Sequence, residues 1–247
     1  MNYAIFLTIV NLTLLARLRL IFRDNGATGK DLIIIGVVPL FVLLFLQLNW
    51  SWLLLGIHLA TYPVVMKFME GNLEKLNRNR AITLGYQLVI SAILCSPLLD
   101  LRGGASAEKT IDFVSWMVLP DGRISMDTVN VIQVVGAGIL LVINEMNIVL
   151  RYMLKVMGLA SLGTQEDKVS NEEYSMGRLI GLLERIFIVI FVLLNQYSAI
   201  GFILAAKGVT RFSNFKDDRP FAEYVLIGTL LSTLLALITG WGVKILL

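Results

Sequence analysis

The sequence is poor in the residues that build covalent or metal-bound frameworks. It contains one cysteine, Cys95, so no disulfide bond can form within the chain. It also contains one histidine, His58, which leaves too few nitrogen and sulfur ligands for a dedicated zinc or haem centre. We therefore expect no metal and no cofactor, and we interpret Cys95 as a small apolar residue.

Charged residues are scarce as well. Asp, Glu, Lys and Arg make up 16% of the chain and hydrophobic residues 57%, whereas soluble domains have about 25% and 45–50%. The mean hydropathy is +0.77. Apolar runs of about 18 residues recur and are continuous rather than alternating, which favours membrane-spanning helices over strands.

These runs predict the fold. Each is long enough to cross a hydrocarbon core of about 30 Å as a helix. The sequence therefore predicts one all-α transmembrane bundle over residues 1–247, polytopic, with about eight spans. The expected spans are 1–22, 31–48, 52–69, 81–99, 128–150, 177–196, 197–211 and 221–242.

The distribution of positive charge predicts the orientation. Each of the four connections expected in the cytoplasm carries four Lys or Arg, whereas the outer side carries four in total. The positive-inside rule then places the N-terminus and the C-terminus outside. Positive charges follow the first apolar run rather than precede it, so we expect a retained helix and not a cleaved signal peptide. Helix-end charges also explain the pI near 9.0 without nucleic-acid binding.

Two connections are long. Residues 100–127 form the expected outer loop, and its stretch IDFVSWMVLP predicts an amphipathic helix that either lies on the membrane surface or dips into the membrane. Residues 151–176 are polar and mixed in charge, which predicts a solvated cytoplasmic loop. Residues 177–247 then form a C-terminal unit of three helices.

Charges within or beside the apolar runs are the candidate functional groups. A charge at the centre of a spanning helix costs roughly 2.5 to 3.5 kcal/mol on insertion scales, so it is normally partnered or functional. Counting residues from the helix ends places these groups at the inner leaflet, where we expect one polar network. Its expected members are Arg17, Glu145, Glu184, Arg185, Lys207, Arg211 and Glu223. The alternative is structural, because ion pairs can fix helix register and helix-end cations can reach the headgroups.

Other polar residues could line a pathway. These are His58, Asn144 and Gln196. For His58 the competing interpretation is a neutral imidazole that is hydrogen-bonded inside the bundle.

Small residues recur at helical spacing and predict close helix packing. The predicted packing positions are Gly177, Gly181, Gly228, Ser232, Ala236 and Gly240. The pattern fits packing within one chain or the seam of a homo-oligomer.

The last third of the chain carries three motifs. They read GRLIGLLER from 177, AIGFILAAK from 199 and AEYVLIGTLLS from 222. With these motifs the chain resembles a bacterial inner-membrane family that is catalogued only as a domain of unknown function. The resemblance implies a bacterial protein of the inner membrane and implies no activity. Its N-terminal histidine motif has no counterpart in this chain, and His58 is only a faint echo of it.

Three functional classes remain open. The first is an oligomeric channel or transporter that uses the inner-leaflet network. The second is a non-catalytic scaffold or anchor subunit of a stress or phage-defence system, whose loops 67–80 and 151–176 contact a soluble cytoplasmic partner. The third is an intramembrane enzyme, which is less favoured because HExxH and GxSxG motifs are absent and the aspartates lie outside the apolar runs. We therefore name no catalytic residue, and we expect the lipid bilayer, not nucleic acid, as the partner.

Overall fold

The computed structural model describes residues 2–23, 26–71, 75–118, 125–158, 171–215 and 219–247. Within these ranges the chain is helical, apart from an isolated antiparallel pair between Leu46 and Gly103. The all-α prediction is therefore confirmed for the described residues. The chain divides into two compact units, Met1–Leu140 (unit 1) and Leu141–Leu247 (unit 2), and each is described by itself.

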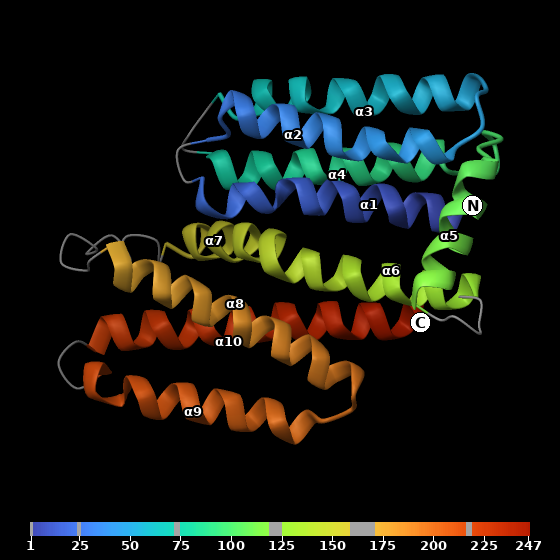
Figure 1. Cartoon of the computed structure of the whole chain (residues 1–247). Coiled ribbons are helices and arrows are strands. Elements are labelled where there is room, and N and C mark those ends of the chain that lie inside the picture. The colour runs from blue at the N-terminus through green and yellow to red at the C-terminus, as the bar shows by residue number, and fades with distance from the viewer. Residues whose placement is uncertain (1, 24–25, 72–74, 119–124, 159–170, 216–218) are drawn as a thin grey trace. The chain divides into compact units, whose positions relative to one another are not determined.

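Unit 1 is a helical bundle with one helix across its end. Figure 1 shows the long helices side by side and α5 lying across the end where the chain begins. The elements are α1 (Tyr3–Arg17), η1 (Leu18–Phe22), α2 (Gly29–Leu40), η2 (Phe41–Phe45), α3 (Trp50–Met69), α4 (Leu76–Leu94), α5 (Ala105–Val118) and α6 (Met126–Leu140). In this unit α1 packs against α2, α4 and α6, and α3 packs against α2 and α4.

Local chemistry explains where the second and third helices begin and end. Asp31 accepts hydrogen bonds from the backbone nitrogen and the hydroxyl of Thr28, which caps α2. Pro39 removes a backbone donor near the end of α2, and the chain tightens into the 3₁₀ turn η2. The side chain of Asn49 then accepts a hydrogen bond from the backbone of Trp52 at 2.8 Å and caps α3.

Unit 2 consists of a helix with a π-helical turn and three long helices. Its elements are η4 (Leu141–Glu145, π-helical), α7 (Met146–Val156), α8 (Asn171–Leu193), α9 (Tyr197–Phe215) and α10 (Arg219–Leu246). Helix α8 packs against α9 and α10, and α10 also packs against α7. The apolar core of the unit gathers Ile188, Val192, Ile200 and Ala236.

Four helices among the described residues are long and apolar enough to cross a membrane. They are Tyr3–Ile21, Trp50–Met69, Met126–Val156 and Glu223–Leu246, and Tyr197–Val209 is a shorter apolar helix. These ranges agree with five of the runs that the sequence predicts as spans.

The predicted cytoplasmic loop 151–176 is partly wrong. Helix α7 continues to Val156, and α8 already begins at Asn171. Gly158 ends the first of these helices with a φ of +74°, a conformation that glycine adopts without strain. The middle of the predicted loop, 159–170, lies outside the described residues.

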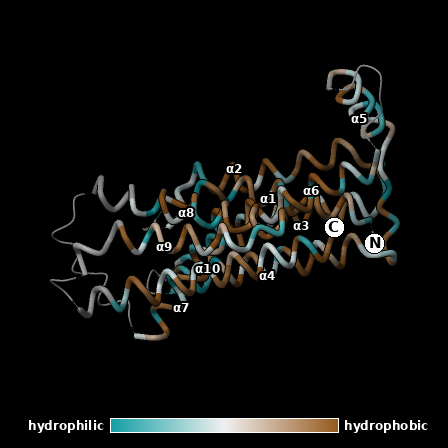
Figure 2. Tube along the Cα trace, turned by 90° about the horizontal axis from the view of Figure 1, so that it is seen from below, coloured by the Kyte–Doolittle hydropathy of each residue, from teal (hydrophilic) through white to brown (hydrophobic). Residues whose placement is uncertain are grey.

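Large apolar side chains are exposed along most long helices, as a membrane protein requires. Examples are Leu44, Trp50, Phe68 and Ile245, which are 65–84% exposed. Soluble monomers rarely expose contiguous apolar surface of this extent. Figure 2 shows hydrophobic residues along the long helices of unit 1, whereas α5 mixes hydrophilic and hydrophobic positions.

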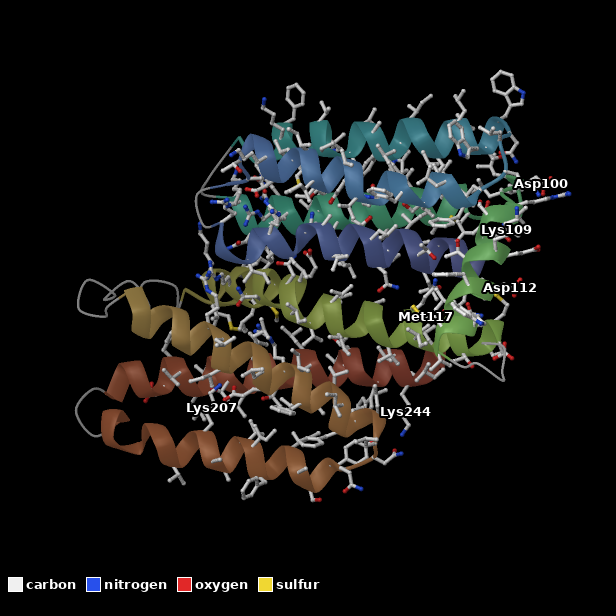
Figure 3. The ribbon with its side chains drawn as sticks, viewed as in Figure 1. Asp100, Lys109, Asp112, Met117, Lys207 and Lys244 are labelled. Atoms are coloured by element: carbon white, nitrogen blue, oxygen red, sulfur yellow. The ribbon has the colours of Figure 1, made fainter. Side chains whose placement is uncertain are left out.

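Residues 111–118 of the amphipathic stretch that the sequence predicts in loop 100–127 lie in α5, and residues 119–120 lie outside the described residues. The first turn of α5 is tied to the end of η2, because Gly104 donates its backbone hydrogen to the carbonyl of Phe45 at 2.8 Å. The side chains of Phe113, Trp116 and Met117 are more than half exposed on this helix. Met117 and the charged Lys109 and Asp112 are labelled in Figure 3.

Candidate functional site

Arg17, like Asp31, is a fully buried charge of unit 1. Its side chain comes from the last turn of α1 and is 0% exposed. One guanidinium nitrogen, Nη1, donates to the hydroxyl of Tyr62 on α3 at 2.7 Å. The other, Nη2, donates to the backbone carbonyl of Arg80 on α4 at 3.1 Å. Arg17 thus joins three helices at one level of the bundle.

A buried ion pair lies next to this junction. Nε of Arg80 donates to Oε1 of Glu70 at 2.7 Å, and the two side chains are only 3% and 7% exposed. The second carboxylate oxygen of Glu70 accepts a hydrogen bond from the backbone of Ala27 at 2.6 Å. Each carboxylate oxygen of Glu70 therefore has a partner, and further hydrogen bonds of this kind help a buried pair to be tolerated.

From this junction a line of polar side chains runs along the buried face of α4. Thr83, Gln87 and Ser91 follow Arg80 at intervals of three and four residues, and each of the three is 1% exposed. The distance along α4 from Arg80 to Ser91 is about 16 Å, roughly half of a hydrocarbon core. A spacing near four keeps these side chains on one helix face.

Polar residues of α1 and α3 extend the same line. Thr13 lies one turn before Arg17 on α1 and is 0% exposed. His58 lies one turn before Tyr62 on α3, next to Gln87, with its ring centroid 5.7 Å from that of Tyr86.

We call this whole set the polar column. It comprises Thr13, Arg17, His58, Tyr62, Glu70, Arg80, Thr83, Gln87 and Ser91.

Several buried atoms of the polar column have no hydrogen-bond partner among the described residues. They are Oγ1 of Thr13, Nε2 of His58, one terminal guanidinium nitrogen of Arg80, both amide atoms of Gln87 and Oγ of Ser91. Buried polar atoms normally bind a protein group or an ordered water, and leaving one unpaired costs about 1–3 kcal/mol. The polar column is therefore suited to water or a small polar solute.

Unit 2 contains an ion pair between two of the charged residues that the sequence analysis expects in a polar network. Nζ of Lys207, on α9, lies 2.5 Å from Oε2 of Glu184, on α8. The side chains are 16% and 17% exposed, so the pair is partly shielded from its surroundings. Figure 3 shows Lys207 extending from α9 towards α8. The pair ties α9, the shortest predicted span, to its neighbour.

Arg185 occupies the apolar face of α8. It is 5% exposed and shares this face with Ile188 and Val192. Its Nε has no hydrogen-bond partner among the described residues. Glu184 and Arg185 are consecutive in the sequence, but the two side chains lie on different faces of α8.

Asn144 and Glu145 lie in the π-helical turn η4. They are 1% and 3% exposed, and the amide of Asn144 donates to the carboxylate of Glu145 at 2.8 Å. π-Helical turns within α-helices are frequent at functional sites. Both residues therefore face the interior, as their predicted roles require.

The remaining predicted residues lie elsewhere. The side chain of Glu223, at the start of α10, is exposed, and Gln196 is exposed in the turn between α8 and α9. In that turn Lys244 contacts Asn195, whose φ of +58° ends α8. The side chain of Arg211 lies outside the described residues. Arg17 belongs to unit 1, so a single network that also includes the charges of unit 2 stays a prediction.

Some of the predicted packing positions are closely surrounded by a neighbouring helix, and others have open space around them. A Cβ on Gly240 would lie 2.9 Å from Cβ of Val192, and Ala236 is 0% exposed in the same core. A Cβ on Gly177, Gly181 or Gly228 would meet no atom within 4 Å. Ser232 is half-buried. The close approach of α10 to α8 is therefore confined to the C-terminal half of the stripe.

The sequence analysis missed Thr83, Gln87 and Ser91. Their spacing of four on α4, repeated by Thr13–Arg17 on α1 and by His58–Tyr62 on α3, is the signal that could have revealed them. None of these positions is charged except Arg17, so a search for charges within apolar runs does not find them. No three His, Cys, Asp or Glu residues gather into a metal site within the described ranges.

Comparisons with known proteins give no family. A scan against models of protein families, a search of curated proteins and a search of solved structures each found no match to this chain. The resemblance of the C-terminal third to a bacterial membrane family therefore stays a prediction from its motifs. The buried groups themselves are then the evidence that bears on function.

Proposed function

We propose that this chain is a multi-span membrane protein that conducts or transports a small polar solute or ion. The observation that carries the proposal is the polar column of unit 1. In a bilayer, buried polar side chains are rare, and they commonly mark pathways for ions or protons. Unpaired polar atoms from three helices, beside a polar line of about 16 Å on α4, have the chemistry of such a pathway over roughly half of the hydrocarbon core.

The proposed topology is a bundle of about eight spans in a bacterial inner membrane, with both termini outside. The charge distribution supports it, because Lys and Arg concentrate in the connections assigned to the cytoplasm. The apolar helices described above support the membrane location. The junction of Arg17, Glu70 and Arg80 then lies at the cytoplasmic end of the polar column.

In the proposed mechanism, polar side chains of the column replace the water molecules that hydrate the solute. Hydroxyl, amide and imidazole groups offer both donors and acceptors, so they can solvate water, a proton or a small solute as it moves. The ion pair between Arg80 and Glu70 closes one end electrostatically. The pair between Glu184 and Lys207 in unit 2 remains a second candidate element of the same function, and assembly into a homo-oligomer remains open.

The experiment is a flux measurement on proteoliposomes. The variants are Gln87→Leu and the double variant Gln87→Leu/Ser91→Ala, assayed for protons, K⁺, Cl⁻ and urea. Two lost hydrogen-bonding groups, worth about 0.5–1.5 kcal/mol each, raise the barrier enough to slow flux roughly tenfold. Thermal stability should stay equal or rise, because an unpaired buried amide is replaced by an apolar group of similar size.

The matched control is Val89→Leu on the same helix. Val89 is 58% exposed, so its replacement should change neither flux nor stability. Wild-type protein that moves none of the four solutes, or Gln87→Leu that moves them at the wild-type rate, would overturn the proposal. A more stable Gln87→Leu variant without any flux change would favour the scaffold or anchor subunit instead.

A further inference from the structure

An apolar groove with a basic end runs between α2 and α3 in unit 1. Its volume is about 740 Å³. Leu32 and Ile33 line it from α2, and Pro63, Val64 and Phe68 line it from α3, with Lys67 at its polar end. Ile33, Val64 and Phe68 are more than half exposed, so the groove opens to the surroundings of the bundle.

The packing of α2 on α3 explains why the groove forms. At Gly36 the two helices approach so closely that a Cβ would lie 2.9 Å from Cγ of Pro63. One helical turn earlier on α2, Leu32 and Ile33 line the open space. The wall beyond Lys67 ends at Gly71, which adds no side chain.

The positive charge at the end of the groove is not neutralised by the described residues. Neither Lys30 nor Lys67 has an ion pair or hydrogen bond there. The two carboxylates that the structure describes near this end are engaged elsewhere. Glu70 binds Arg80 and the backbone of Ala27.

The carboxylate of Asp31 is also engaged. It binds Arg23 at 2.9 Å and Arg19 at 3.4 Å, and it is 1% exposed. Helix α2 begins at Gly29 and α3 ends at Met69, so a short antiparallel connection brings Lys30 and Lys67 to the same end. Lys67 thus lines the groove, and Lys30 adds a second positive charge at the same end of the two helices.

We propose that this groove binds one anionic phospholipid, with an acyl chain along the apolar walls and the phosphate at Lys67 and Lys30. Basic pockets between spanning helices are suited to anionic headgroups, and each lysine near such a surface strengthens binding about fivefold. The inference rests on the proposed membrane embedding but not on the proposed conduction.

The test is native mass spectrometry of the detergent-purified full chain with dioleoyl phosphatidylglycerol or dioleoyl phosphatidylcholine. Wild type should retain the anionic lipid in preference to the zwitterionic one. Lys67→Gln and Lys30→Gln should each lower retention of phosphatidylglycerol roughly fivefold, and Lys67→Arg should keep it. Val64→Trp, which fills the groove, should lower retention of both lipids.

The matched control is Lys109→Gln, an exposed lysine of α5, which should retain phosphatidylglycerol as wild type does. Equal retention of the two lipids by wild type would overturn the proposal, as would unchanged retention in Lys67→Gln or Val64→Trp. Displacement by excess inorganic phosphate would assign the lysines to a free phosphate and also overturn it. Loss of solute flux in Gln87→Leu leaves lipid retention untouched, so the two proposals fail separately.

Discussion

At the residue scale, ionisable groups in this chain are held by neutral partners as well as by opposite charges. Arg17 binds a phenol and a backbone carbonyl, and Glu70 binds a backbone nitrogen as well as Arg80. Hydrogen bonds of this kind reduce the penalty of burying a charge. The charge pattern of the sequence therefore locates such residues without revealing their partners.

Variants of the ion pair between Glu184 and Lys207 can distinguish a structural role of the pair from a role in solute flux. We expect Glu184→Gln to insert and purify normally but to lower flux several-fold, because the charge at this level of the bundle changes. A double-mutant cycle with Lys207→Gln should give a coupling free energy of unfolding of about 1 kcal/mol or more, measured by denaturation in detergent.

The control for this cycle is Glu184→Gln combined with Lys244→Gln, a cation in the last turn of α10 that contacts Asn195 beyond the end of α8. These two substitutions should be additive within about 0.5 kcal/mol. If both single variants fail to fold and Glu184→Gln/Lys207→Gln folds normally, the pair is architectural.

At the scale of elements, glycine decides how closely helices approach at two places. Gly36 meets Pro63 where α2 crosses α3, and Gly240 meets Val192 where α10 crosses α8. Both neighbours are rigid, because proline is a ring and valine is branched at Cβ. The other glycines of α10 face open space and have no such role.

Gly240→Ala should therefore destabilise the protein. The added methyl overlaps Val192 in a closed core and should lower the free energy of unfolding by about 1–3 kcal/mol. Gly228→Ala in the same helix is the control, and it should be neutral or stabilising by up to about 1 kcal/mol. Thermal denaturation in detergent measures both. Equal effects of the two substitutions would contradict the assigned contact between α8 and α10.

At the scale of the whole molecule, the open question is how many times the chain crosses the membrane. Each of the four long apolar helices overlaps a predicted run, because length and hydropathy are properties of the sequence. Helix α4 is not among them, since its first turns carry Arg78 and Arg80 and its buried face is polar.

Cysteine labelling can test the proposed topology. In a Cys95→Ala background, single cysteines at Ser106 and Leu247 should react with an impermeant maleimide in right-side-out vesicles. Cysteines at Lys75 and Val156 should react only in inside-out vesicles, because about eight spans place them in the cytoplasm. All four native side chains are exposed, so reactivity reports sidedness rather than burial. Labelling of Ser106→Cys and Lys75→Cys from the same side would show that α4 does not cross.

The sequence by itself determined the class of protein and the places of its long helices, because hydropathy and run length are local quantities. It also located Glu184, Lys207, Asn144 and Glu145 as candidate groups, because a charge or amide stands out in an apolar run. It placed the ends of the predicted loop 151–176 wrongly, since α7 continues to Val156 before the turn at Gly158 and α8 already begins at Asn171.

Only the tertiary structure decided which groups meet. Arg17, Tyr62 and Arg80 are far apart in the chain, and their contact depends on how α1, α3 and α4 rotate about their axes. The same rotation turns Thr83, Gln87 and Ser91 inwards. Thr83 donates to the carbonyl of Arg80, whereas Gln87 and Ser91 become functional candidates because their polar atoms are buried without partners among the described residues. Burial is a property of the packed bundle, and no spacing in one helix fixes the face that its neighbours cover.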